Sequence, residues 1–247
     1  FTSTNLNSLN LTTISRGELG TLEYKLNYEK NGKEISPWHD IPLKNENNYN
    51  FITEIPRLST SKMEISTKEE YNPITQDSKN NKPRHYAGPI YWNYGCFPQT
   101  WEDPNEKNAE LNAFGDNDPL DVIEISSRSL PLGSVTPVKV LGVFAMLDGG
   151  ELDWKVLAIN RDDPLYNELN DVDDVEKKLP GYISGIREWF RWYKIPDGKP
   201  LNSFGYDEKC LSKHHALHVI NETHEAWKRL VFSNQSKGKL WIGNKNK

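Results

Sequence analysis

VKVLGVFAMLDGGELDWKVLAI, residues 138–159, is the stretch of this sequence that decides the fold. Its two ends, residues 138–146 and 154–159, are short and mainly apolar, as expected for buried strands. Gly149 and Gly150 lie between them, and paired glycines favour the tight turn of a β-hairpin. The stretch therefore predicts two buried strands that pair back on each other.

The rest of the first half also has the pattern of short strands separated by turns. We predict further strands over residues 21–28, 49–55, 62–66 and 121–126. The first of them alternates apolar and polar residues and leads into an Asn31-Gly32 turn, which is typical of hairpins. The segment 71–89 is rich in Asn, Lys and Pro, and this composition predicts a loop.

The period changes in the second half of the chain. Residues 164–178 and 182–194 carry apolar positions three and four apart, which favours helices. The clearest helix is predicted over residues 213–231. Its apolar stripe is made of Leu217, Ile220, Trp227, Leu230 and Val231.

These elements predict one domain over residues 1–247, because we find no internal repeat and no linker. The expected fold class is α+β and mainly β, a β-barrel followed by packed helices. We expect the core to span about residues 20–231, with residues 1–15 and 233–247 as extended tails.

Composition excludes several broad classes. Apolar residues make up 36 % of the chain, and no apolar run approaches the length that crosses a bilayer. The net charge of −5 argues against non-specific nucleic-acid binding, so neither nucleic acid nor membrane is expected as a partner. Two cysteines, Cys96 and Cys210, favour a reducing, cytoplasmic location. The acid-free residues 1–15 also suit an organellar presequence stub, so an organelle is the alternative.

The segment Gly115-Asp116-Asn117-Asp118-Pro119-Leu120-Asp121 contains the strongest chemical signal. Its three carboxylates would repel one another unless a cation lay between them. Pro119 restricts the backbone, so the segment is a shaped turn that leads into a strand. Hard oxygen ligands on a rigid turn suit Mg²⁺. An EF-hand is excluded, because Asp121 stands where its glycine belongs and Ser127 where its glutamate belongs.

Three further groups of charged residues have an ordinary structural explanation when each is taken alone. Asp148, Asp153 and Lys155 lie around a hairpin turn, where charges are usually solvated. Glu54, Lys62 and Glu64 could form nothing more than a surface ion pair. The basic and aromatic run 191–194 ends a helix, where Lys and Arg are favoured electrostatically.

Taken together, the groups match metal-assisted phosphoryl transfer, which needs carboxylates for metals and Lys, Arg and Tyr for anionic oxygens. The chain has no Walker-type P-loop, no G-x-S-x-G nucleophile motif and no supported Cys–His pair. The helical residues His214, His215 and His218 lack the glutamate of a zinc H-E-x-x-H motif. A partly exposed helix face explains them better than zinc does.

The ordered motifs resemble family I soluble inorganic pyrophosphatases, and are closest to the eukaryotic branch. The resemblance runs from about residue 20 to about 231. Its motifs are Glu54-Ile-Pro-Arg57, Lys62-Met-Glu64, Asn93-Tyr-Gly95 with Phe97-Pro-Gln-Thr-Trp101, Gly115–Asp121, Asp148–Lys155 and Trp189–Lys194. It implies a five-stranded, OB-like closed β-barrel with flanking helices, a homodimer, and hydrolysis of pyrophosphate to two phosphates.

The resemblance also implies roles for single residues. Asp118 would orient and deprotonate the attacking water, and Tyr94 and Lys155 would line the catalytic pocket. The substrate phosphates would be bound by Lys62, Arg84, Tyr193 and Lys194. Several Mg²⁺ ions, or Mn²⁺ or Zn²⁺ as substitutes, would be held by Glu54, Glu64, Asp116, Asp121, Asp148 and Asp153.

One departure from the family pattern bears on the substrate contacts. The family usually has a tyrosine four residues before the Tyr94 position, where this chain has Ile90 followed by Tyr91. The loop from Arg84 to Tyr94 is also shorter. Two other hypotheses remain open from the residues alone: a calcium- or sugar-binding β module, and an inactive homologue that serves as a partner subunit.

Overall fold

The centre of the fold is the hairpin of β15 (Val135–Asp148) and β16 (Glu151–Asn160), as the sequence predicts. Their antiparallel register runs from Val138 opposite Asn160 to Asp148 opposite Glu151. Gly149 and Gly150 form the turn with φ of 61° and 98°, positive values that glycine adopts without strain. Both strands are longer than the apolar runs that identify them.

Five strands form a hydrogen-bonded ring in this computed structural model, which describes residues 2–6, 9–233 and 237–243. β6 (Asn48–Ile55) pairs with β11 (Asn93–Cys96), and β11 pairs with β14 (Asp121–Glu124). β14 then runs parallel to β16, while β15 pairs with both β16 and β6 and completes the ring. The same sheet includes β5 (Lys44–Asn45), β12 (Lys107–Asn108), β13 (Ala113–Gly115), β17 (Ser203–Phe204) and β18 (Leu211–Ser212).

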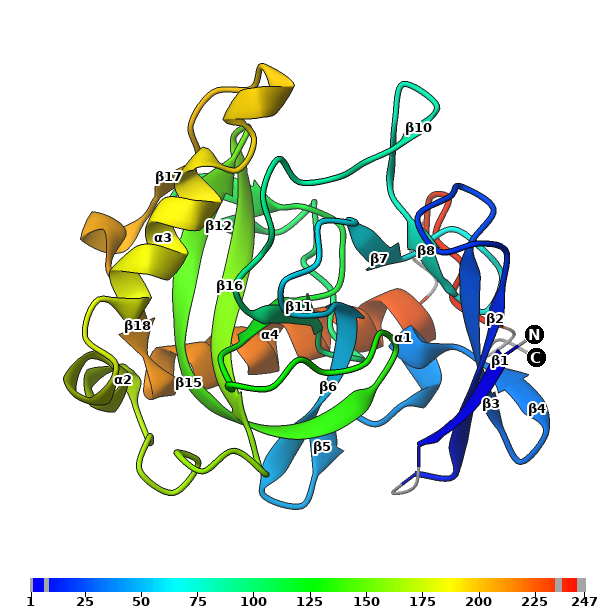
Figure 1. Cartoon of the computed structure of the whole chain (residues 1–247). Coiled ribbons are helices and arrows are strands. Elements are labelled where there is room, and N and C mark those ends of the chain that lie inside the picture. The colour runs from blue at the N-terminus through cyan, green and yellow to red at the C-terminus, as the bar shows by residue number, and fades with distance from the viewer. Residues whose placement is uncertain (1, 7–8, 234–236, 244–247) are drawn as a thin grey trace.

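The described part of residues 1–15, which is residues 2–6 and 9–15, is not the extended tail that we expected. β1 (Thr2–Leu6) and β2 (Leu11–Arg16) begin a second sheet. The other strands of this sheet are β3 (Lys25–Lys30), β4 (Lys33–Ile35), β7 (Met63–Ile65) and β8 (Ile74–Gln76). Leu11 and Thr13 of β2 are both buried, and the small polar threonine in an inward position hides the apolar alternation from the sequence. Figure 1 shows this sheet beside the ring, on the side opposite α3.

The segment 71–89 is also more ordered than the expected loop. It contains β8 and a small hairpin of β9 (Ser78–Lys79) and β10 (Lys82–Pro83). Asn80 and Asn81 turn the hairpin with positive φ, which asparagine tolerates better than most residues. β9 and β10 were not predicted because their polar, largely exposed sequence resembles that of a loop, and β8 because its three residues are too few to show a period.

Helices pack on the outside of the ring (Figure 1). α1 (Pro37–Asp40) is a single turn, and the later helices are α2 (Val172–Lys178), α3 (Tyr182–Trp192) and α4 (Lys213–Phe232). Two short 3₁₀ turns are η1 (Ile195–Asp197) and η2 (Tyr206–Glu208). The helix predicted over 164–178 starts later, because Asp171 and Asp174 form a capping box at its true beginning.

The two faces of β16 are both buried, which explains its continuous apolar run. Trp154, Val156 and Ala158 pack in one cluster with residues of α4, including Val219. Leu157 and Ile159 point to the opposite face and belong to the larger core cluster, which includes residues of α3. Asp153 and Lys155 alternate with the first set, so they share the α3 side of the strand.

The described part of the C-terminal segment is likewise attached to the body. The Trp241 amide donates to the Thr67 carbonyl at 2.9 Å, and Ile242 is buried. His39 Nε2 lies 3.0 Å from the Trp241 carbonyl oxygen. Residues 237–243 are therefore not the extended tail that we expected, and the remainder of that tail lies outside the described residues.

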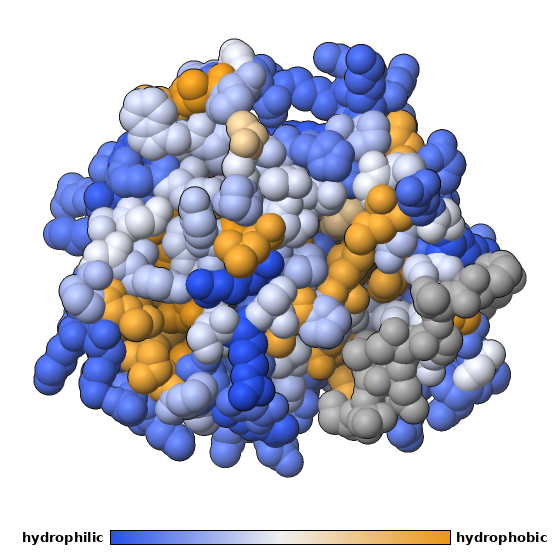
Figure 2. Space-filling model, in the orientation of Figure 1, coloured by the Kyte–Doolittle hydropathy of each residue, from blue (hydrophilic) through white to orange (hydrophobic). Residues whose placement is uncertain are grey.

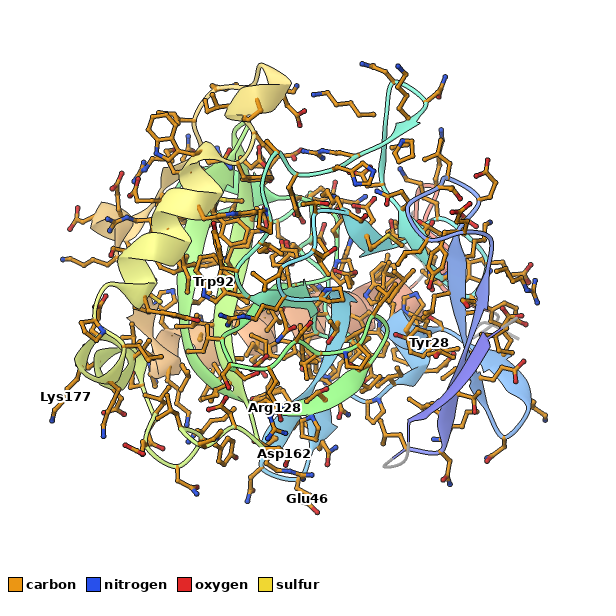
Figure 3. The ribbon with its side chains drawn as sticks, viewed as in Figure 1. Tyr28, Glu46, Trp92, Arg128, Asp162 and Lys177 are labelled. Carbon is orange, nitrogen blue, oxygen red and sulfur yellow. The ribbon has the colours of Figure 1, made fainter. Side chains whose placement is uncertain are left out.

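Polar and apolar side chains separate as a water-exposed molecule requires. Hydrophilic residues predominate on the face in Figure 2, with apolar residues in scattered groups. In Figure 3, Glu46, Asp162 and Lys177 point away from the body, whereas Tyr28 points from β3 into the interior. Within the described residues, every helix is too short or too polar to cross a membrane.

Candidate functional site

The thirteen residues that the sequence analysis selected all line one cavity of about 220 Å³. The acidic residues among the thirteen are Glu54, Glu64, Asp116, Asp118, Asp121, Asp148 and Asp153. The basic and phenolic residues among them are Lys62, Arg84, Tyr94, Lys155, Tyr193 and Lys194, and Glu151 and Tyr86 line the cavity as well. The fold thus collects residues that lie up to 140 positions apart in the chain, since the set begins at Glu54 and ends at Lys194. The function of each remains a prediction at this point.

Strand pairing places the centre of the acidic side. Asp121 begins β14 and is the direct partner of Lys155 on β16. Lys155 forms ion pairs with Asp121 and with Asp153, which lies two residues earlier on the same face. Although burial alone would lower the pKa of Lys155, these two carboxylates hold it well above its usual value. The Tyr94 hydroxyl from β11 donates to Asp121 Oδ2 at 2.5 Å.

The turn that carries Asp116 and Asp118 is held by hydrogen bonds within it and to residues 101 and 102. Asn117 has a φ of 73°, and its amide donates to the Glu102 carbonyl at 2.9 Å. Trp101 Nε1 donates to Asn117 Oδ1 at 3.1 Å. Asp116 Oδ1 accepts from the Asp118 amide at 3.0 Å. The turn is therefore rigid enough to keep several carboxylates at one place.

Glu102 is a site residue that the sequence analysis missed. One oxygen each from Glu102, Asp116 and Asp153 lies within 4.8 Å of the other two, the one such acidic group found in the described residues. Glu102 Oε1 accepts from the Trp154 amide at 2.9 Å, whereas the buried Oε2 has no hydrogen-bond partner. In the sequence, the feature that could have identified Glu102 is its position directly after the Phe97–Trp101 motif.

A glycine allows this approach. A Cβ atom on Gly115 would lie 2.5 Å from the carbonyl carbon of Glu102, which is too close for any side chain. Gly115 therefore lets the Glu102 backbone pass directly beside the acidic turn. This is a structural reason for the glycine that begins the Gly115–Asp121 motif.

Burial, followed by the charges of neighbouring carboxylates, raises the pKa values of Glu102, Asp118 and Glu54. Burial, and then the charges of Asp116 and Asp153, raise the pKa of Glu102 well above its usual range. Burial likewise raises the pKa of Asp118 to about 7, with Glu64 and Asp121 as the next causes. Burial, with Asp121 as the second cause, raises the pKa of Glu54 to about 8. A cation would relieve this repulsion.

The cavity also holds basic side chains, which lie among the carboxylates. Asp77, also missed from the sequence, bridges two of them: its Oδ2 lies 3.1 Å from both Lys62 Nζ and Arg84 Nη1. Arg84 Nε also lies 3.6 Å from Asp197 Oδ2 of η1. Lys194 pairs with Asp148, yet burial and the charge of Arg84 lower its pKa to about 8. These side chains suit an anion with several oxygens.

The remaining candidates from the sequence lie elsewhere. Ile90 is fully buried and Tyr91 is 51 % exposed, and neither lines the cavity. His218 Nε2 lies 3.1 Å from Glu222, and His215 packs against Trp154 with ring centroids 5.7 Å apart. His214 and His218 are exposed and His215 is half-buried on α4, which agrees with a partly exposed helix face.

The comparisons with known proteins agree with this geometry. The family model described as inorganic pyrophosphatase matches residues 51–228. The chain is 52 % identical over 216 residues to soluble inorganic pyrophosphatase 1, chloroplastic, of Chlamydomonas reinhardtii, covering 87 % of this chain and 77 % of that one. The type I enzyme of Toxoplasma gondii superposes with a TM-score of 0.86 at 48 % identity, over 89 % of this chain and 99 % of that one. For the inorganic pyrophosphatase of Schistosoma japonicum the TM-score is 0.90 at 45 % identity, over 93 % and 84 %.

Proposed function

This chain belongs to the inorganic pyrophosphatase family, and on that premise we propose how its residues divide the hydrolysis of pyrophosphate into two phosphates. The family is metal-dependent, and the chain carries the acidic cluster that such chemistry needs. The observation that carries the proposal is the single cavity lined by eight carboxylates together with Lys62, Arg84 and Lys194. The carboxylates suit cations, and the basic side chains suit phosphate oxygens.

The residues present fit divalent cations. The buried Glu102 Oε2 has no hydrogen-bond partner and lies in the group with Asp116 and Asp153, a donor set of hard oxygens only. We assign the cations to Glu102, Asp116, Asp121 and Asp153 on one side. Glu54, Glu64 and Asp148 are assigned to those nearer the substrate. Mg²⁺ is the proposed metal, with Mn²⁺ or Zn²⁺ as substitutes.

Bound cations would lower the pKa of a water molecule and offset negative charge on the phosphates. Asp118 is the proposed general base. It lines the cavity with the carboxylates assigned to the cations, and bound cations would keep it ionised and able to accept a proton. Tyr94 and Lys155 hold Asp121 and Asp153 in place through the contacts described above.

Substrate binding falls to Lys62, Arg84, Tyr193 and Lys194. Their donors would bind the phosphoryl oxygens and stabilise the charge that develops on the leaving phosphate. Cys96 also lines the cavity, but burial and the nearby Glu54 raise the pKa of its thiol well above the usual value. The thiolate needed for covalent attack is therefore disfavoured, which supports direct attack by water.

The proposal also includes four features of the whole protein, namely its barrel, its single domain, its oligomeric state and its location. The five-stranded ring is proposed to be an OB-like closed barrel, within one domain over residues 1–247. The chain is proposed to form a homodimer, which light scattering after size exclusion would test.

A cytoplasmic location is proposed, with an organelle as the alternative, since relatives include chloroplastic forms. Fractionation of cells that produce the protein would decide between them.

The test is phosphate release from pyrophosphate with millimolar Mg²⁺, repeated with Ca²⁺ in its place. We expect turnover that Mg²⁺ supports and Ca²⁺ suppresses. Asp118→Asn should lower kcat by about 10²–10⁴-fold, the usual contribution of a general base. Asp162→Asn is the control, because that side chain is exposed at the surface (Figure 3). Full activity in Asp118→Asn would contradict its assignment, and a trapped phosphoenzyme would exclude direct attack by water.

A further inference from the structure

One hydroxyl in the cavity has no function in the scheme above. Tyr86 lies between β10 and β11 and lines the cavity together with Arg84 and Lys62. Its backbone is fixed, because the Tyr86 amide donates to the Thr60 carbonyl at 2.8 Å. The chain is extended here, with a bridge between His85 and Ser61. Arg84 and Tyr86 therefore share one face of the segment, and His85 points to the other.

The Tyr86 ring is held firmly by aromatic neighbours. It meets the Trp189 ring edge-on, with centroids 5.1 Å apart and planes at 82°. It meets the Tyr193 ring in the same way, at 5.7 Å and 77°. The whole residue is only 8 % exposed. Contacts of this kind depend on the ring and not on its hydroxyl group.

The hydroxyl group itself is left available. Among the residues that the structure describes, none forms a hydrogen bond with the Tyr86 oxygen. After burial, the charges that act most strongly on it are those of Lys62 and Lys155, followed by Asp121 and Arg84. Burial, partly opposed by the two lysines, raises the pKa of Tyr86 to about 12, so the group keeps its proton at neutral pH. A hydroxyl donor that is held in place in the same cavity as Lys62, Lys155 and Arg84 suits an anionic oxygen.

We propose that Tyr86 is a substrate-binding residue whose hydroxyl donates a hydrogen bond to a phosphoryl oxygen of pyrophosphate, beside Lys62 and Arg84. This inference rests on the proposed function of the cavity. It also identifies how the short loop between Arg84 and Tyr94 contributes to the site. The residues nearer to Tyr94 do not contribute, because Ile90 is sealed in the core and Tyr91 faces solvent.

The experiment compares Tyr86→Phe with Tyr91→Phe. Both changes remove one hydroxyl group and keep the ring, and the exposed Tyr91 lies outside the cavity. We expect kcat/KM for pyrophosphate to fall about 10–100-fold in Tyr86→Phe, mainly through KM, because a hydrogen bond to a charged group is lost. Tyr91→Phe should stay within about twofold of the wild type. The melting temperature of Tyr86→Phe should match that of the wild type, since the ring contacts remain.

Direct binding separates this inference from the function on which it rests. Methylenediphosphonate, which cannot be hydrolysed at the bridging carbon, is titrated with Mg²⁺ present into the wild type and both variants. Weaker binding in Tyr86→Phe alone supports the inference, whereas equal binding in all three overturns it. A wild type that releases no phosphate would overturn the proposed function, and the titration would still decide whether Tyr86 binds a diphosphate-like anion.

Discussion

Asp121 on β14 and Lys155 on β16 are direct partners across a parallel strand pair, and their side chains form an ion pair inside the cavity. Lys155 also pairs with Asp153, so one buried ammonium group stands between two carboxylates. Without bound cations, the positive charge of Lys155 is therefore the main charge that offsets the negative charges of this part of the acidic cluster. Bound metal ions and the Lys155 ammonium group should therefore both increase the free energy of unfolding.

Lys155→Met should destabilise the metal-free protein. Removing a buried partner leaves uncompensated carboxylates, which typically costs about 3–5 kcal/mol. Added Mg²⁺ should restore part of this loss, because cations can take over the compensation. The measurement is urea unfolding in EDTA and in Mg²⁺, with the exposed Lys177→Met as the control (Figure 3). Equal destabilisation in both conditions would contradict the prediction.

Glu102→Gln should stabilise the metal-free protein, whereas Lys155→Met should destabilise it. The amide oxygen can still accept from the Trp154 amide, but the repulsion from Asp116 and Asp153 is removed. The melting temperature in EDTA should therefore rise, while the affinity for Mg²⁺ falls about 10–100-fold. Differential scanning fluorimetry over a Mg²⁺ series measures both, with Glu46→Gln as the matched surface control. If the variant loses stability in EDTA, Glu102 is not under electrostatic stress.

The metal-free protein should become less stable as pH rises. The pKa values of Glu54, Asp118 and Asp153 are raised from 4.5, 3.8 and 3.8 to about 8, 7 and 7. The folded state therefore binds more protons than the unfolded state between about pH 4 and pH 8, and the free energy of unfolding falls across this range. Urea midpoints in EDTA across these pH values test the trend. Saturating Mg²⁺ should flatten it, and a rise with pH would contradict it.

Arg84→Met should weaken substrate binding more than catalysis. Asp77 and Asp197 hold the guanidinium group over the cavity, at 3.1 and 3.6 Å, where it can bind phosphate oxygens. We expect KM for pyrophosphate to rise about 10–100-fold, the effect of losing a charged hydrogen bond. Steady-state kinetics with Mg²⁺ measure this, and the surface variant Arg128→Met is the control (Figure 3). An unchanged KM would remove Arg84 from the substrate-binding set.

Tyr28→Phe should affect stability alone. The Tyr28 hydroxyl on β3 is fully buried and donates to the Gly133 carbonyl at 2.8 Å, which joins the second sheet to the segment before β15. Loss of this bond leaves a buried carbonyl without its donor and should cost about 1–3 kcal/mol. Chemical denaturation measures the loss, with Tyr91→Phe as the control. The kcat should not change, because Tyr28 lies outside the cavity.

Local patterns were sufficient for much of the fold and of the site. The β15–β16 hairpin, α3 and α4 were predictable because backbone sterics and the burial of one face impose periods that a sequence displays directly. The acidic turn 115–121 was equally readable, since its carboxylates are close in sequence and Pro119 shapes the backbone. The resemblance to the family then supplied the site residues that lie far from this turn in the sequence.

Long-range packing decided the rest. The sequence by itself determined the hairpin, the helices and the chemical character of the acidic turn, because each depends on neighbours along the chain. Only the tertiary structure decided that residues 2–6 and 11–16 join a sheet, that Glu102 meets Asp116 and Asp153, that Asp77 bridges Lys62 and Arg84, and that Tyr86 lines the cavity. These positions depend on strand register, on the close approach at Gly115 and on the completion of the ring. Such contacts join residues far apart in the chain, and no local period records them.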